Sequence, residues 1–194
     1  SNGTQFTFNN QKYNIPLFGS HQARNAALAI DVISQFDSNI KHDMIYKALK
    51  TVFWPCRMQK VEKRVFYDVS HNKKGMEKTL QTLKELFPNK DIYGLLCLKK
   101  DKDLKSLKSL ILKNLKTLIV SEDQNGLLLK STVLAKELAR INIKCNKANS
   151  IKDGTVILKR LLKNNSSIGL IFGSHYIAEE VFCAFEISFD NYYI

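Results

Sequence analysis

From residue 64 onward, the hydrophobic pattern of the chain alternates between two forms. Short runs of almost continuous apolar residues are followed by a polar turn and then by a segment whose apolar residues recur every three or four positions. The short runs predict strands that are buried on both faces, and the three-and-four spacing predicts amphipathic helices. The runs expected to form strands are residues 65–69, 92–98, 117–120, 143–145 and 168–172.

Five strand-helix repeats predict an α/β fold, namely a doubly wound, mostly parallel, Rossmann-like sheet with helices on both faces. The first helix illustrates the pattern, since Met76, Leu80, Leu83 and Leu86 share one face and Pro88 ends it. Ligands of such sheets bind beyond the carboxyl ends of the strands. Polar segments stand at those ends, at residues 68–72, 100–103, 121–123 and 173–175.

The first sixty residues follow another pattern. Residues 6–8 and 13–15 flank a turn at Asn9–Asn10 and predict a hairpin. Two helices should follow, the first capped by Ser20 and the second ended by Pro55. A hairpin and two helices bury little surface alone, so this segment resembles the tail of another domain. The expected organisation is a tag remnant at 1–3, such a tail at 4–53 and the α/β domain at 54–194.

Composition supports a globular protein and leaves the role of its charge open. The 194 residues include 30 Lys and Arg against 18 Asp and Glu, giving a formal charge of +12, and 44% are hydrophobic. Most cations are lysines at helical spacing, such as Lys105, Lys108 and Lys113, without the interleaved aromatic residues that stack on bases. A solvated helix face is therefore favoured over a nucleic-acid-binding stripe.

Cysteine usage and hydropathy indicate a cytoplasmic protein. The four cysteines form no C-x-x-C pair and have no histidine at metal-ligand spacing, so they are expected to be reduced thiols in a reducing compartment. Cys97, Cys145 and Cys183 stand among apolar residues and are expected to be buried. No apolar run reaches the roughly 18 residues that span a bilayer, and no signal-peptide pattern opens the chain.

Five short motifs occur in a fixed order along the chain. They are G-S-H-Q-A-R-N at 19–25, W-P-C-R at 54–57, D-V-S-H-N at 68–72, D-K-D at 101–103 and G-S-H-Y at 173–176. Each is weak alone. Their succession resembles the folylpolyglutamate synthase/dihydrofolate synthase branch of the Mur ligase family, whose motifs read G-x-H-Q-x-x-N, W-P-G-R, D-G-A-H-N, D-K-D and G-S. The resemblance covers essentially the whole chain.

The resemblance implies an ATP-dependent amide ligase that adds L-glutamate to a folate or to dihydropteroate through an acyl phosphate. ATP and Mg²⁺ would be bound mainly by a central domain with a P-loop, and the α/β domain would be the C-terminal one. No G-x-x-x-x-G-K-[ST] occurs in this chain, so the fragment is expected to be inactive alone. The family also implies a monomer without nucleic-acid or membrane partners.

Four residues are the candidate site. The resemblance places Asn25 near the adenine and makes Arg57 and His71 both catalytic and nucleotide-binding. A guanidinium such as that of Arg57 forks two N–H groups toward phosphate oxygens. Asp68 would accept from a ribose hydroxyl, fix the adjacent loop, or cap the helix that begins near Lys73.

No metal ligand is assigned in this chain. Asp101 and Asp103 stand two apart at a predicted helix start, where carboxylates are first a capping and dipole device.

The motifs also depart from the family pattern. Cys56 replaces a glycine of W-P-G-R, and Val69 and Ser70 replace Gly-Ala. If those glycines need a positive φ, the loops here should differ in shape and in their backbone contacts to nucleotide.

Two other functions stay open at this stage. One is a stand-alone Rossmann-like module that binds nucleotides or nucleic acids, which the charge favours and the missing G-x-G-x-x-G fingerprint opposes. The other is an interaction domain, because an exposed apolar face on residues 20–53 would suit a partner as well as a severed domain. Within the ligase reading, dihydrofolate synthase and folylpolyglutamate synthase activity are not distinguished.

Overall fold

The structure is a computed structural model that describes residues 3–37, 39–162 and 165–188. The chain forms two compact units, Ser1–Arg57 and Met58–Ile194. The first unit contains the hairpin of β1 (Thr4–Phe8) and β2 (Gln11–Ile15) and the helices α1 (Ser20–Phe36) and α2 (His42–Thr51). The predicted hairpin is confirmed.

The turn of the hairpin has the geometry that its two asparagines favour. Phe8 pairs with Gln11, which leaves a two-residue loop. Asn9 (φ 46°) and Asn10 (φ 61°) are both left-handed, as a type I′ turn requires, and asparagine tolerates this region better than most residues.

Helix α1 begins differently from the prediction. The cap position is Gly19, Ser20 is the first helical residue, and no side chain caps the helix. The Gly19 carbonyl accepts from the Gln22 N–H at 2.9 Å, and the Gly19 N–H donates to Thr4 Oγ1 at 3.0 Å, so strand β1 fixes the backbone at the start of the helix.

The apolar face expected on residues 20–53 is exposed within the first unit. Its members are Leu28 (64%), Val32 (58%), Ile33 (37%), Phe36 (86%), Met44 (59%) and Phe53 (39%).

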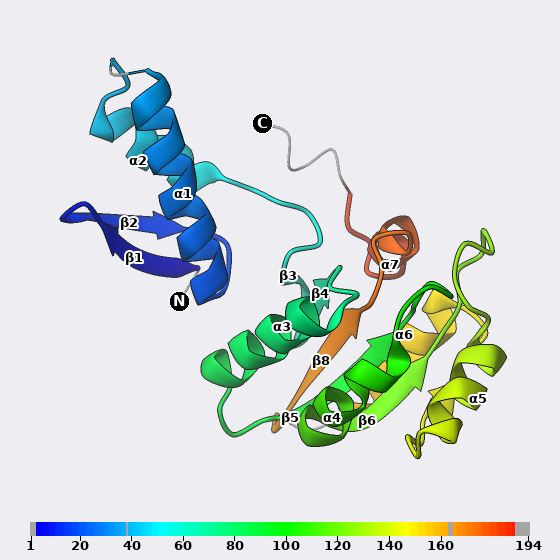
Figure 1. Ribbon diagram of the computed structural model, residues 1–194. Coiled ribbons are helices and arrows are strands. Elements are labelled where there is room, and N and C mark those ends of the chain that lie inside the picture. The colour runs from blue at the N-terminus through cyan, green and yellow to red at the C-terminus, as the bar shows by residue number, and fades with distance from the viewer. Residues whose placement is uncertain (1–2, 38, 163–164, 189–194) are drawn as a thin grey trace. The chain divides into compact units, whose positions relative to one another are not determined.

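The second unit is built on a six-stranded sheet of order β3-β4-β8-β5-β6-β7, shown in Figure 1. The strands are β3 (Gln59–Glu62), β4 (Val65–Asp68), β5 (Asp91–Leu96), β6 (Leu115–Val120), β7 (Asn146–Lys147) and β8 (Ser167–Phe172). Only β3 is antiparallel to its neighbour. The predicted mostly parallel α/β sheet is confirmed.

Two details of the sheet differ from the prediction. The fourth parallel strand is Asn146–Lys147 rather than 143–145, because Asn146 and Lys147 are the residues that pair with β6. Strand β3 was not expected. Its four residues alternate between buried and exposed positions, which is typical of an edge strand and too short to stand out in the sequence.

Five helices cover the sheet: α3 (Lys73–Leu86), α4 (Leu104–Asn114), α5 (Ser131–Arg140), α6 (Ile151–Leu161) and α7 (Ala178–Ala184). Helices α3 and α4 pack on each other, as do α6 and α7. Because crossovers are right-handed, α6, which returns from β7 to β8, covers the face opposite α3 and α4 (Figure 1). The two-faced covering is as predicted.

The cysteine environments are mixed. Cys56 and Cys97 are buried, Cys145 is half-buried and Cys183 is exposed, so the expected burial of Cys183 is wrong. Cys183 lies on α7, a short helix that turns this position to solvent. In the described ranges, no helix has the length and apolar character needed to cross a bilayer.

Candidate functional site

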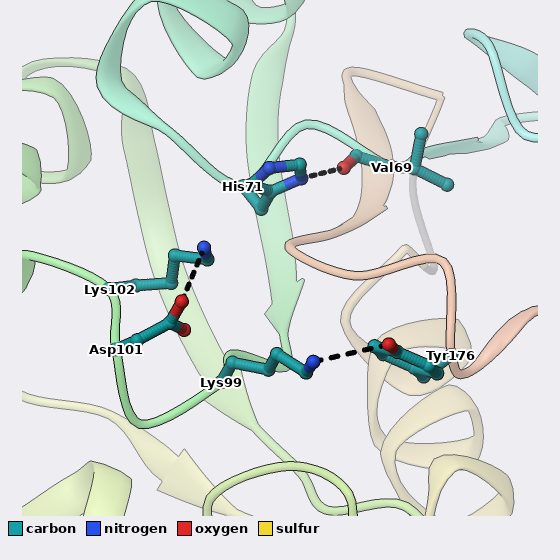
Figure 2. A network of polar contacts seen from close by, with 6 residues as sticks. All are labelled: Val69, His71, Lys99, Asp101, Lys102 and Tyr176. Atoms are coloured by element: carbon teal, nitrogen blue, oxygen red, sulfur yellow. Dashed lines mark hydrogen bonds and ion pairs between the residues drawn. The ribbon is translucent and has the colours of Figure 1, made fainter.

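The candidate site lies at the carboxyl edge of the sheet, where the direction of the crossovers changes. Asp68 at the end of β4 and Leu96 at the end of β5 both pair in register with Phe172 of β8. The loops that follow these three strands therefore meet at one edge, where ligands of doubly wound sheets bind. Figure 2 shows six of their residues, here called the carboxyl-end cluster: Val69, His71, Lys99, Asp101, Lys102 and Tyr176.

Asp68 is a buried carboxylate that organises the first loop. Its side chain is 4% exposed. Oδ2 accepts from the Met58 N–H at 2.9 Å, and Oδ1 accepts from the Ser70 N–H at 2.8 Å and from Thr79 Oγ1 at 3.0 Å. Of the three roles considered for Asp68, these contacts match the one in which it fixes the adjacent loop. The cap of α3 is Asn72, whose side chain accepts from the Gly75 N–H at 2.8 Å.

His71 lies in the same loop, and one of its ring nitrogens is already hydrogen-bonded. Its Nδ1 lies 3.0 Å from the Val69 carbonyl oxygen. Since a carbonyl only accepts, Nδ1 carries the proton and Nε2 of the neutral ring is left as the acceptor. His71 is half-buried, and Figure 2 shows its ring with the hydrogen bond to the Val69 carbonyl. The loop thus presents an oriented imidazole whose Nε2 can bind a donor.

The carboxylates of the D-K-D segment serve the loop itself. Asp103 caps α4 by accepting from the Lys105 N–H at 3.0 Å and the Ser106 N–H at 3.3 Å, which confirms the capping expectation. Asp101 accepts from Lys102 Nζ at 3.0 Å. That hydrogen bond, helped by the charges of Lys102 and Lys99, lowers the pKa of Asp101.

Lys99 and Tyr176 form a contact that sequence reasoning missed. Lys99 Nζ donates to the Tyr176 hydroxyl at 3.1 Å and lies 4.4 Å from the centre of its ring. The ring of His175 lies against that of Tyr176, with the ring centres 4.2 Å apart and the planes tilted by 33°. The available signal was the position of Lys99 directly after an apolar strand, but its partner is 77 residues away in the chain.

The loop after β8 is fixed by contacts with residues of β4 and of the loop after β5. Tyr67, fully buried in β4, donates its hydroxyl to the Ser174 carbonyl at 2.7 Å. Gly173 has φ 110°, and a Cβ at this position would lie 2.2 Å from the Cys97 carbonyl oxygen. Ser174 Oγ accepts from the Tyr176 N–H at 3.1 Å. The backbone that carries Tyr176 is therefore fixed by its packing against β4 and β5.

Two of the candidate residues belong to the first unit. Arg57 is exposed, and its guanidinium lies 5.7 Å from the ring centre of Trp54. Asn25 is exposed on α1 and donates from Nδ2 to Gln22 Oε1 at 3.1 Å. Asp68 and His71 are brought together in the second unit, while Asn25 and Arg57 are presented separately by the first.

The replaced motif glycines behave in two ways. Cys56 has φ 61°, so the loop before Arg57 keeps a left-handed residue although it is not glycine, and the expectation that this loop must change shape is wrong in that respect. No positive φ occurs at Val69 or Ser70 among the described residues. The backbone at those two positions needs no glycine.

The carboxylates in the loop after β6 accept hydrogen bonds from backbone N–H groups of the protein itself. Glu122 Oε2 accepts from the Ser131 N–H at 2.6 Å at the start of α5. Asp123 accepts from the N–H groups of Leu127 and Leu128, both at 2.8 Å. Glu180 of α7 accepts from the Gln124 N–H at 3.0 Å. This loop is therefore a rigid support rather than a part of the carboxyl-end cluster.

Glu180 makes stability pH-dependent in an unusual direction. Burial is the main cause that raises its pKa, and the charges of Asp123 and Glu179 add to it. A carboxyl group whose pKa is higher in the folded state destabilises the fold when charged, so this cost disappears as the pH falls through the raised pKa. We expect Glu180→Gln, which keeps the acceptor for Gln124, to be at least as stable as the wild type at pH 7.

Urea unfolding between pH 7 and pH 4 checks this expectation. The advantage of Glu180→Gln should shrink as the pH falls. Glu77→Gln, at an exposed position of α3 that is not among the groups acting on Glu180, is the matched control and should show no such trend. A Glu180→Gln variant that is less stable than the wild type at every pH would contradict the assignment.

Two cavities lie away from the carboxyl-end cluster. One of about 750 Å³ lies along α5 and β7, and another of about 500 Å³ lies between α6 and α7. We assign the candidate site by topology and by converging side chains. Within the described ranges, no group of three His, Cys, Asp or Glu side chains could hold a metal ion.

Comparison with solved structures identifies the fold. A crystal structure of Mycobacterium tuberculosis folylpolyglutamate synthase in complex with ADP and AMPPCP matches 97% of this chain and 46% of its own, with a TM-score of 0.86 and 22% identity. A bifunctional folylpolyglutamate synthase/dihydrofolate synthase with Mn, AMPPNP and L-glutamate bound matches with a TM-score of 0.76 and 16% identity. The second unit thus has the α/β fold of the corresponding part of these synthases.

Sequence comparison is more specific. No family model matches the chain. It is 29% identical over 192 residues to the dihydrofolate synthase/folylpolyglutamate synthase of Bacillus subtilis strain 168, an alignment that covers 92% of this chain and 44% of that protein. It is 31% identical over 97 residues to the Mycobacterium tuberculosis protein of the same name, or 46% of this chain and 20% of that one. The chain is homologous to the C-terminal part of folylpolyglutamate synthase/dihydrofolate synthase.

Proposed function

We propose that this chain is the C-terminal part of an ATP-dependent ligase that joins L-glutamate to a folate or to dihydropteroate. The observation that carries the proposal is the homology to the Bacillus subtilis synthase over 92% of the chain. The chain spans less than half the length of that relative, 44%, so the activity is proposed for the whole protein. The order of the five motifs along the chain supports the same function.

We further propose that residues 4–53 are the tail of a central ATPase domain and residues 54–194 the C-terminal domain. The exposed apolar side chains of α1 and α2 support this division, because the rest of such a domain would cover them. Under this proposal the chain has no P-loop of its own and does not turn over alone. We expect the whole protein to be a cytoplasmic monomer.

When bound, ATP would supply the phosphoryl group that activates the carboxylate of the substrate. The chain's own residues would bind and orient. Arg57, exposed beside Trp54, would direct its two terminal N–H groups toward phosphate oxygens. His71 would offer Nε2 to a donor of the nucleotide, since Nδ1 is held by Val69.

The remaining candidates have smaller parts. Asn25 would pair with the adenine through its amide. Asp68 already accepts three hydrogen bonds, so we propose that it positions the loop of His71 rather than making the main ribose contact. We propose that Mg²⁺ is held mainly by the central domain.

The test is the formation of ADP by the full-length protein that carries this chain. We expect it to require both L-glutamate and a folate or dihydropteroate. Arg57→Gln should lower kcat on the order of 100-fold, as loss of a donor to developing charge does. Asn25→Ala should raise the KM for ATP about tenfold, the effect of one lost hydrogen bond.

The matched control for these variants is Arg24→Gln, an exposed cation next to Asn25 on α1, which should leave both constants unchanged. An immunoblot of the source cells gives a second reading, since the proposal needs a gene product about twice the size of this chain. A gene product of the chain's own size would contradict the ligase proposal and favour a stand-alone binding module. The same conclusion follows if the full-length protein forms no ADP with either acceptor.

A further inference from the structure

The cavity of about 750 Å³ along α5 and β7 has no part in the function proposed above, and we call it the β7 groove. Its wall on α5 consists of residues spaced three or four apart, which share one helix face: Thr132, Ala135, Lys136 and Ala139. Ala135 and Ala139 end at Cβ, so this wall leaves room beside the edge of the sheet.

The β7 groove carries positive charge without a compensating negative charge. Lys136, Lys144 and Lys147 line it, and none of its described lining residues is acidic. Within the described ranges, no carboxylate oxygen lies within 4.0 Å of these three ammonium groups. Glu137, the acidic residue of α5, is paired with Arg140. The groove therefore repels a second copy of itself and attracts an acidic partner.

The strand that borders the groove is an edge of the sheet. In the part of the chain that the structure describes, β7 pairs with β6 and has no strand on its other side. An edge strand offers backbone N–H and C=O groups that can pair with an added strand. Ile143 and Cys145 also line the groove and give such a strand apolar contacts. None of the described lining residues is aromatic, so the stacking that binds single-stranded nucleic acids is missing.

We propose that the β7 groove binds an extended, acidic peptide segment of a partner protein, which adds a strand to this edge of the sheet. Alternate side chains of an extended segment point to opposite sides, so apolar side chains can cover Ala135 and Ala139 while carboxylates meet the lysines. Lysines on a sheet edge discourage pairing with ordinary strands, whereas a strand rich in Asp or Glu is attracted by them. The inference is independent of the proposed ligase activity, because it involves no residue of the candidate site.

The test is the binding of a blocked synthetic peptide, E-V-E-V-E-V-E, to the full-length protein that carries this chain, without nucleotide or folate. Isothermal titration calorimetry measures the Kd, which should rise with ionic strength. A variant that combines Lys136→Gln, Lys144→Gln and Lys147→Gln should raise the Kd about tenfold, since each exposed ion pair contributes a factor of about 1.5 to 5. All three side chains are exposed, so the variant should fold normally.

Two controls separate strand addition from general charge attraction. A variant that combines Lys84→Gln, Lys105→Gln and Lys113→Gln removes the same charge from exposed positions of α3 and α4 and should leave the Kd unchanged. The same peptide with methylated valine N–H groups keeps its carboxylates but cannot pair fully with β7. It should bind about tenfold more weakly.

Alkylation of Cys145, read by mass spectrometry, locates the complex. Cys145 is half-buried in the groove, and the exposed Cys183 of α7 is the internal reference. Because burial raises the pKa of the Cys145 thiol, the reaction is run at alkaline pH, where the thiolate forms. Saturating peptide should slow the alkylation of Cys145 about fivefold or more and leave that of Cys183 unchanged.

Three results would overturn the inference. The first is no binding at peptide concentrations up to about 1 mM. The second is general anion attraction, shown by equal weakening in the two lysine variants or by equal binding of the methylated peptide or of oligothymidylate. The third is a Cys145 as unreactive as the buried Cys97 before peptide is added, because another part of the full-length protein would then fill the groove. None of these results bears on the ligase activity.

Discussion

Replacing Gly173 with alanine is expected to lower the free energy of unfolding by about 3 kcal/mol or more. A Cβ at Gly173 would lie 2.2 Å from the Cys97 carbonyl oxygen and 2.8 Å from Leu96 Cδ1, so strand β5 would have to move. The φ of 110° adds backbone strain, which costs on the order of 1–3 kcal/mol in a non-glycine residue. Displaced packing adds a similar amount.

Urea unfolding followed by circular dichroism measures this effect. Gly126→Ala is the matched control, because Gly126 also has a positive φ (69°) but a Cβ there meets nothing within 4 Å. It should cost only about 1 kcal/mol, the strain of a single left-handed residue. Equal losses in the two variants would show that contact with β5 is not what requires glycine at 173.

Removing the carboxylate of Asp68 is expected to cause the second large loss of unfolding free energy. Asp68→Ala leaves the buried N–H groups of Met58 and Ser70 without their acceptor, and each such loss costs about 1–3 kcal/mol. We therefore expect a loss of about 3–5 kcal/mol in unfolding free energy. The loop of His71 should loosen, so the full-length protein should also lose activity.

Thr79→Val separates the hydroxyl contact from the backbone contacts of Asp68. Thr79 donates to Asp68 Oδ1 at 3.0 Å, and its loss should cost about 1 kcal/mol because both backbone donors keep their acceptor. Urea unfolding of the two variants side by side checks the difference. An Asp68→Ala variant as stable as Thr79→Val would refute the view that the carboxylate organises the loop.

Much of the fold was predictable because burial on both faces leaves a plain signature. The runs at β4, β5, β6 and β8 are almost continuously apolar, and each became a central parallel strand. The edges were not predictable in the same way. Strand β7 is Asn146–Lys147, two exposed polar residues that are a strand only because β6 lies beside them.

The candidate site was predictable in part. The motifs singled out Asp68 and His71, and the structure brings both into one loop at the carboxyl edge of the sheet. Lys99 and Tyr67 belonged to no motif, and Tyr176 was singled out only as the last residue of the G-S-H-Y motif. Their roles depend on contacts across 77 and 107 residues of chain, which no local pattern encodes.

The sequence by itself therefore determined the α/β class, the hairpin and the order of the motifs, because hydrophobic periodicity and turn chemistry act between near neighbours in the chain. Only the tertiary structure decided which polar side chains are already hydrogen-bonded within the protein. Asp68 and Asp101 resemble available carboxylates in the sequence, yet one is consumed by the loop and the other by Lys102. Lys99 resembles any surface lysine in the sequence, yet its ammonium group donates to the Tyr176 hydroxyl, since hydrogen bonding depends on which groups the fold brings within about 3 Å.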